Sequence, residues 1–357
     1  MIFSKSLIAL DIGSTAIKLV ELNGLQKKSL QSLGLEPLPP KSVVDGIIAN
    51  QDVVSAAIKT LLKKLKIIPL NRRVSIGLSG SSILIKKISI TTQKDMDINE
   101  QIFAEAEQHF QADMADIYFD FYQLPIANAT EVDTEKTVIL VGAKREMIEK
   151  IISTVRDAGL RTAVVECSAF SALNMYEYNY GISEGLSVIV DVGAHTTKIS
   201  LTVNGIFADS REIPIAGEEY TRRIVEGLQV DSANAESLKI ASSQGEGNTP
   251  PDLARIIGDT NEMMVQEIRN SIDYFLQGGD HLARGCQLSQ IYLTGGGSRV
   301  LGLDATLAAT LQVPVKMINP FQKIEINTKT FQMDYVLMQG HLFGISVGLG
   351  LRSFGDK

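Results

Sequence analysis

The chain has 357 residues, enough for two or more domains, and its composition of 45% hydrophobic and 21% charged residues is typical of a folded protein. A net charge of -7 argues against a broad surface for nucleic acid. The cysteines Cys167 and Cys286 form no CxxC pair, which favours reduced thiols and a cytosolic location.

Short apolar, β-branched runs alternate along the chain with amphipathic helical patterns, and this alternation predicts an α/β fold. The expected strands are 6–13, 16–24, 72–80, 137–144, 186–193, 197–203 and 290–297. The expected helices are 52–66, 99–110 with Asn99 as N-cap, 145–160 with Gly159 at its C-terminal end, and 260–277.

Two regions, 83–164 and 211–289, are predicted to be inserted subdomains, the second mainly helical. No apolar run reaches the roughly 20 residues that a membrane-spanning helix needs. The first run is interrupted by Asp11 and is therefore expected to be a strand rather than a signal peptide. The C-terminal stretch 344–357 has no amphipathic basic face, so we expect no membrane anchor in the chain itself.

One stretch is repeated: ALDIGSTAIKLVEL at 9–22 returns as VIVDVGAHTTKISL at 188–201. Each copy is a strand, a small-residue turn and a second strand, with one Asp before the turn and one Lys after it. Such turns present backbone N–H groups to an anion, and a carboxylate approaches a phosphate through Mg²⁺ and its waters. Asp11 and Asp191 therefore predict a clamp on a metal polyphosphate, although either one alone is also compatible with a turn cap.

A third element, an apolar strand ending in Thr-Gly-Gly-Gly-Ser at 294–298, allows a ligand to approach the backbone. No P-loop, dinucleotide-binding or HExxH pattern occurs in the chain, and Ser168 and Ser171 do not lie in a G-x-S-x-G elbow. The four histidines are scattered, which argues against a zinc site.

In this order the three turns resemble the phosphate-1, phosphate-2 and adenosine motifs of the actin/Hsp70/sugar-kinase ATPase superfamily, with 166–176 and 340–352 similar to its connecting helices. The resemblance implies an actin-like ATPase fold of two duplicated ribonuclease-H-like halves, with ATP or ADP and Mg²⁺ between them. The implied subdomains are 1A (1–82, 165–184 and 335–357), 1C (83–164, inserted), 2A (185–210 and 290–334) and 2B (211–289).

The resemblance also implies the site residues. Those on the phosphates would be Gly13, Ser14, Thr15, Lys18, Gly193, His195, Thr196 and Thr197. Those near adenosine would be Gly295, Gly296, Gly297 and Ser298, with Glu236 and Lys239 beside the base and ribose. For the last two, a surface ion pair is an equally good interpretation.

The second copy departs from the superfamily pattern, because it has Ala194, His195 and Lys198 where freer or acidic residues are usual. Asp191 and Glu166 are the catalytic candidates, Glu166 as a general base or only as a cap of the following helix. We therefore expect tight ATP binding with slow or no hydrolysis.

The place of the 83–164 insertion and the opening DIGSTAIKLVEL are similar to the FtsA-like branch, and to the PilM family in particular. This implies a cytoplasmic actin-like scaffold of type IV pilus assembly, held at the inner membrane by its partners. Those partners would be the N-terminal cytoplasmic tail of PilN, in a groove between 1A and 1C near 83–90, and other pilus platform and motor proteins. An FtsA- or ParM-like filament former that self-associates is the alternative, and a sugar or acyl kinase is disfavoured because no catalytic Asp with a polar cluster is evident.

Overall fold

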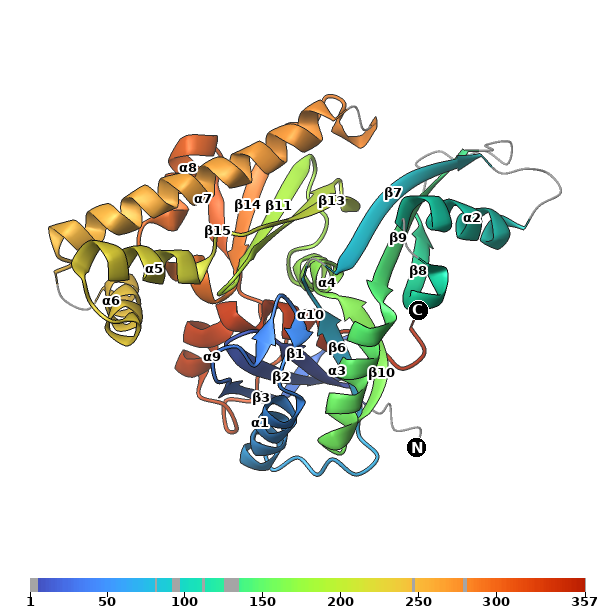
Figure 1. Cartoon of the computed structure of the whole chain (residues 1–357), viewed down its shortest axis with the longest axis horizontal. Helices are drawn as coiled ribbons and strands as arrows, with labels where there is room; N and C mark the ends of the chain where they lie inside the picture. The colour runs from blue at the N-terminus through green and yellow to red at the C-terminus, as the bar shows by residue number, and fades with distance from the viewer. Residues whose placement is uncertain are drawn as a thin grey trace.

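The computed structural model describes residues 6–80, 82–91, 97–110, 113–124, 135–245, 248–278 and 281–356. Its frame is a pair of five-stranded sheets (Figure 1). The first sheet has the order β10-β6-β1-β2-β3, with β1 Ile8–Ile12, β2 Ala16–Asn23, β3 Ser29–Pro37, β6 Arg73–Leu78 and β10 Arg161–Cys167. The second has the matching order β15-β14-β11-β12-β13, with β11 Leu186–Val192, β12 Thr197–Val203, β13 Ile206–Ile213, β14 Leu288–Thr294 and β15 Val315–Met317.

The two sheets repeat the same pairing as well as the same order. In each, the first strand forms an antiparallel hairpin with the next strand and lies parallel to a later one, β6 or β14. Asp11 lies opposite Lys18 in the first hairpin, and Asp191 lies opposite Lys198 in the second. Both residues of the pair shift by 180 positions, so the predicted repeat is a true structural duplication.

A third, three-stranded sheet is inserted in the first half, with the order β7-β9-β8: β7 Ile83–Thr91, β9 Glu135–Lys144 and β8 Ile117–Gln123. Helix α2, Ile98–Phe110, packs on it and shares a small core with it. The N-cap of α2 is Asp97, whose carboxylate accepts a hydrogen bond from the Asn99 amide at 3.0 Å, and not Asn99 as expected.

The inserted subdomain is smaller than expected. Helix α3, Arg145–Asp157, packs beside α1, Gln51–Lys64, in the core of the first half. Strand β10 belongs to the first sheet. The insertion therefore ends near residue 144 instead of 164, because the apolar stripe of α3 is buried by the first half.

The second half carries α5 Gly217–Leu228, α6 Ser232–Gln244, α7 Pro251–Gln277 and α8 Leu303–Leu311. Helix α7 begins well before the expected residue 260, with Pro251 in its first turn, where a missing N–H costs nothing. The 27-residue α7 shares one core with α5, α8 and the second sheet, and it lies along that sheet in Figure 1. The region 211–289 therefore shares its core with the second half.

Helices α4, Ser168–Tyr180, and α10, Gly344–Gly350, lie between the two sheets (Figure 1). They cross closely, because a Cβ on Gly348 would lie 1.8 Å from the Ser171 carbonyl oxygen. A core cluster here joins both sheets, β1 through Ala9 and β14 through Tyr292. The remaining elements are the hairpin strands β4 Val43–Val44 and β5 Ile47–Ile48, α9 Met333–Gln339, and the 3₁₀ turns Met114–Asp116, His281–Ala283, Gly296–Arg299 and Gly340–Phe343. Within the described residues, no helix combines the length and apolar character needed to cross a bilayer.

Candidate functional site

One pocket lies where the two halves meet, and both repeated turns open into it. The glycine turn after β14 and the connecting segment before α10 complete it. Its lining includes Asp11, Gly13, Ser14, Thr15, Lys18, Asp191, Gly193, Ala194, His195, Thr196, Lys198, Gly295 and Gly296. Most of the predicted phosphate residues are thus brought together by the duplication.

The two turns have the same geometry. The Gly13 amide donates to the Ala16 carbonyl at 3.1 Å, and the Gly193 amide donates to the Thr196 carbonyl at 3.1 Å. A Cβ on Gly193 would lie only 2.7 Å from the Thr196 oxygen, so glycine is required for this tight closure. Two such turns that face one pocket provide backbone donors for phosphate oxygens from both sides.

Each turn also carries an ion pair of a carboxylate and a lysine. The ammonium of Lys18 is 3.1 Å from Asp11, and that of Lys198 is 4.0 Å from Asp191. Burial by itself would lower the pKa of Lys18, but Asp11 and Asp191 outweigh it, and the pKa is raised above its usual value. Burial raises the pKa of Asp191, more than Lys198 and Lys18 lower it. Lys18 is therefore a cation inside the pocket.

The oxygen donors of Asp11 and Asp191 fit Mg²⁺, which in nucleotide sites takes one or two carboxylates and completes its shell with phosphate oxygens and water. Among the described residues no cluster of three or more His, Cys, Asp or Glu side chains could hold a metal by itself. A metal here would therefore depend on the phosphates of a ligand.

His195 links the two halves across the pocket. Its Nδ1 is 2.8 Å from the Ser14 hydroxyl in the first turn, and its Nε2 is 3.1 Å from a carboxylate oxygen of Glu218 at the start of α5. The imidazole is only partly buried, so both contacts lie at the edge of the pocket. The residue predicted as a phosphate ligand thus bridges the two turns.

The glycine turn after β14 approaches Asp191 directly. Gly295 has φ +89°, and a Cβ there would lie 2.3 Å from an Asp191 carboxylate oxygen. Its amide donates to the His341 carbonyl at 2.8 Å. Gly297 and Ser298 lie behind the turn and do not line the pocket. Ser298 donates its hydroxyl to the Gly295 carbonyl at 2.6 Å and so supports the turn from inside.

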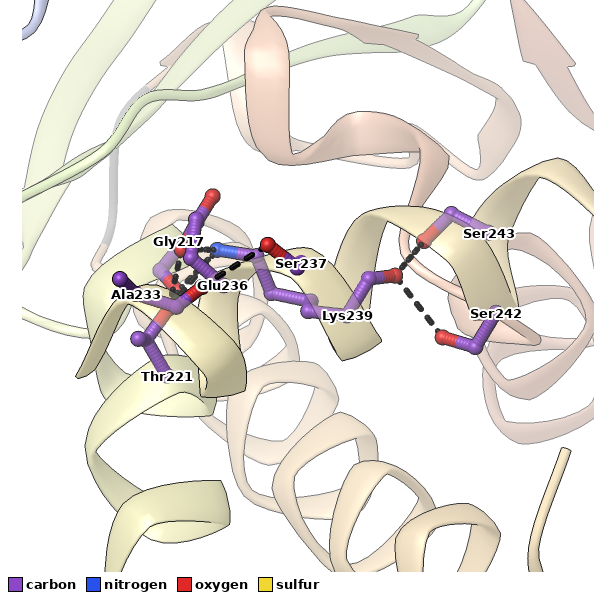
Figure 2. Close-up of polar contacts among 8 residues, drawn as sticks. All are labelled: Gly217, Thr221, Ala233, Glu236, Ser237, Lys239, Ser242 and Ser243. Carbon is purple, nitrogen blue, oxygen red and sulfur yellow. Dashed lines mark hydrogen bonds and ion pairs between the residues drawn. The ribbon is translucent and has the colours of Figure 1, made fainter. Parts of the chain in front are cut away.

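Glu236 and Lys239 on α6 meet the start of α5, as Figure 2 shows. The buried ammonium of Lys239 donates to the Gly217 carbonyl at 2.9 Å, to the Thr221 hydroxyl at 2.9 Å and to Glu236 at 2.7 Å. The Gly217 amide in turn donates to the carbonyl of Gly193 in the second turn at 3.1 Å. The pair does not line the pocket, but Lys239 is no surface ion-pair partner, because it anchors α6 to the start of α5.

Two further predicted residues, Thr197 and Glu166, do not line the pocket. The buried Thr197 hydroxyl donates to the Ile215 carbonyl at 2.7 Å. The position equivalent to Thr197 in the first repeat is the core residue Ile17, which explains this inward direction. Glu166 accepts hydrogen bonds from Ser171 at 3.1 Å, Asn174 at 2.8 Å and Arg352 at 3.2 Å. Burial raises the pKa of Glu166, while Arg352 opposes the change.

Several pocket residues were missed. Asp45 and Gly46 form the turn between β4 and β5, with φ values of +48° and +72°. An Asp-Gly pair between β-branched residues is a strong hairpin signal that could have identified this turn. Glu212 lies opposite Lys198 on β13, and Ser79 and Gly80 follow β6. These three residues could be assigned to the pocket only once the order of the strands in the sheets was known, and no local sequence pattern gives that order.

Comparisons with known proteins agree with this architecture. A family model described as type IV pilus assembly protein PilM matches residues 9–354. Among curated proteins, cell division protein FtsA of Bacillus subtilis is 21% identical, over 88% of this chain and 78% of the relative. FtsA of Pseudomonas aeruginosa is 23% identical, over 89% and 84%.

Solved structures share the fold. A PilM-PilN type IV pilus biogenesis complex superposes with a TM-score of 0.85 and 24% identity, covering 99% of this chain and 100% of the other. MreB5 of Spiroplasma citri bound to AMPPNP gives a TM-score of 0.54 and 14% identity, covering 97% and 95%. The expected actin-like ATPase fold is therefore confirmed.

Proposed function

Because the chain belongs to the family of type IV pilus assembly protein PilM, we propose that it is an actin-like, nucleotide-binding scaffold of type IV pilus assembly. The observation that carries the nucleotide part is the pair of equivalent turns, each with its carboxylate and lysine, at one pocket between the halves. MreB5, a protein of the same fold, was solved with AMPPNP bound, and this supports a nucleoside triphosphate as the ligand.

In this proposal the turn amides and Lys18 hold the phosphates of ATP or ADP, and Gly295 and Gly296 admit the adenosine. The Glu236–Lys239 pair supports the base side through Gly217. Asp11 and Asp191 hold Mg²⁺ through water, and the metal, when bound, offsets phosphate charge and fixes the orientation of the phosphate chain.

We propose that hydrolysis is slow or negligible. Attack on a phosphate needs a base that positions water. Glu166 already accepts three hydrogen bonds, one of them from a guanidinium, and does not line the pocket. Asp191 does line it, but Lys198 follows the second turn where the superfamily usually has another acid. The nucleotide then acts as a structural ligand between the halves.

The experiment for the nucleotide claim is calorimetric titration of the purified chain with ATP in the presence and absence of Mg²⁺. Asp11→Ala should abolish measurable binding, whereas Asp304→Ala, an exposed carboxylate on α8, should bind like the wild type. Unchanged affinity of the Asp11 variant would remove the first turn from the site.

For the partner, we propose the N-terminal cytoplasmic tail of PilN. A protein of the same fold has been solved as a PilM-PilN complex. In this chain β7 is an edge strand of the inserted sheet, and an edge strand can pair with an extended peptide. The expected groove lies between 1A and 1C, which would keep the protein at the inner membrane through partners.

Fluorescence anisotropy with a labelled PilN-tail peptide tests this claim. The claim is supported if the peptide binds the wild type and no longer binds the Ile85→Asp variant of β7. Thr91→Asp, at the far end of the same strand, is the control and should still bind the peptide. No binding at high micromolar concentration, together with nucleotide-dependent sedimentation of the chain alone, would instead favour the filament-forming alternative.

A further inference from the structure

The loop between α1 and β6 presents two aliphatic side chains to solvent. Ile68 is 75% exposed and Leu70 is 76% exposed, among the highest values for large hydrophobic residues in the described chain. In Figure 1 this loop runs along the outer end of the first half, from the end of α1 to β6. Single exposed aliphatic residues are common, but two within three residues are a small apolar patch.

The loop has a defined shape. Ile67 turns inward and packs against the core of the first half, and its amide donates to the Leu62 carbonyl at 2.9 Å. Pro69 lies against Gly159 at the end of α3, and the Pro69 carbonyl accepts the Arg72 amide at 2.9 Å. Ile68 and Leu70 are thus held outward by fixed neighbours on both sides.

The sequence that contains the patch is rich in positive charge. Residues 53–94 contain nine Lys or Arg and no Asp or Glu, in a chain whose net charge is -7. Lys63 and Lys66, beside the patch, are exposed and form no ion pair within the described residues. Lys64 is 59% exposed although it pairs with Glu36 at 2.6 Å.

The patch lies far from the pocket. Strand β6 begins at Arg73, directly after the loop, and the residues that follow its other end, Ser79 and Gly80, line the pocket. The whole strand therefore separates the two. The nucleotide site does not explain this surface.

We propose that Ile68, Leu70 and the cations Lys63, Lys64 and Lys66 form a lipid-contact surface for an anionic bilayer. The two aliphatic side chains enter the boundary between headgroups and acyl chains, and the lysines bind lipid phosphates. Exposed lysines that precede two exposed aliphatic side chains match the charge and the apolar boundary of an anionic membrane surface. A surface this small gives weak, reversible contact, so it adds to partner-mediated attachment rather than acting as an anchor.

The test is co-sedimentation of the full chain with extruded vesicles, either phosphatidylglycerol with phosphatidylethanolamine or phosphatidylcholine alone. We expect binding to the anionic vesicles, suppressed by salt, and none to the neutral ones. The double variant Ile68→Ser, Leu70→Ser should weaken binding by about tenfold or more. Lys63→Glu with Lys66→Glu should weaken it at least as much.

The matched control is Leu337→Ser on α9, another exposed aliphatic, which should bind vesicles like the wild type. Thermal unfolding of each variant checks that the loop changes leave the fold intact. If the wild type does not bind anionic vesicles, or if the loop variants bind as well as the control, the proposal is wrong and the patch serves a protein partner instead.

A second readout does not depend on sedimentation. Ile68→Cys labelled with an environment-sensitive dye, in a Cys167→Ser, Cys286→Ser background, should shift to shorter emission wavelength when anionic vesicles are added. The same dye at Leu337→Cys should not shift. Equal shifts at both positions, or none at Ile68, would overturn the proposal.

Discussion

The two repeated turns share one backbone geometry but differ in their chemistry. The first has Gly13, Ser14 and Thr15, and its lysine is 3.1 Å from its carboxylate. The second has Gly193, Ala194 and His195, and its lysine is 4.0 Å from its carboxylate. The first turn thus keeps the small, hydroxyl-bearing residues of a phosphate cradle. The second has exchanged part of that cradle for contacts of His195 with Ser14 and Glu218.

The largest expected effect is a difference in ATP affinity between variants of Lys18 and Lys198. Lys18→Ala removes a buried cation from Asp11 and leaves that carboxylate beside the phosphates. Removing one partner of a buried charged contact costs about 4 kcal/mol of binding free energy, which lowers ATP affinity roughly a thousandfold. Lys198→Ala should weaken binding by only about tenfold, because its ion pair is looser. Calorimetric titration of both variants with ATP measures the difference, and equal losses would contradict the asymmetry.

The second prediction concerns His341, whose carbonyl accepts a hydrogen bond from the Gly295 amide in the glycine turn of the second half. Burial lowers the pKa of His341 to about 4. The unfolded chain therefore binds a proton between pH 6.5 and 4 that the folded chain does not. Stability should fall as the pH falls through this window, by up to about 3 kcal/mol from this group. Urea unfolding of wild type and His341→Gln at pH 7 and pH 4.5 isolates the effect, since the variant should lose less stability.

The third prediction concerns the stability effect of Gly295, because the equivalent position in the first half has a large side chain. Strand registers make Leu78, the last residue of β6, the equivalent of Gly295, the residue that follows β14. Leu78 keeps a buried side chain, whereas a Cβ on Gly295 would lie 2.3 Å from an Asp191 oxygen. Gly295→Ala should therefore lower the free energy of unfolding by about 2 to 4 kcal/mol, from strain plus displacement of Asp191.

Gly245→Ala is the matched control for this change. Gly245 also has a positive φ of +71°, but a Cβ there would meet nothing within 4 Å. It should cost only about 1 kcal/mol, the price of the left-handed conformation. Urea denaturation of both variants gives the comparison, and equal losses would show that contact with Asp191 is unimportant.

These differences show what the sequence could and could not reveal. The Asp-Gly-hydroxyl pattern located both turns because it is local, and the two copies share one spacing. The same spacing matches Thr197 to Ile17, a core residue, so a strict alignment of the repeats would have excluded Thr197 from the pocket. Glu166 could not be judged from the chain, because its partner Arg352 lies at the other end of the sequence. The C-terminal end of the insertion was predicted wrongly because it also depends on tertiary packing. Helix α3 has an ordinary amphipathic pattern, and the sequence does not show which core buries its apolar face.

The smallest expected effect tests the bridge between the turns. His195 contacts Ser14 in the first turn and Glu218 behind the second, so it couples the halves. A hydrogen bond of this kind contributes about 0.5 to 1.5 kcal/mol. His195→Ala should therefore speed hydrogen exchange in 13–18 and 193–198 by roughly three- to tenfold, while His109→Ala, on the exposed face of α2, should leave both segments unchanged. Glu218→Ala removes only the outer contact and should have a smaller effect than His195→Ala. If the exchange rates stayed at the wild-type values in both variants, His195 would have no role in coupling the halves.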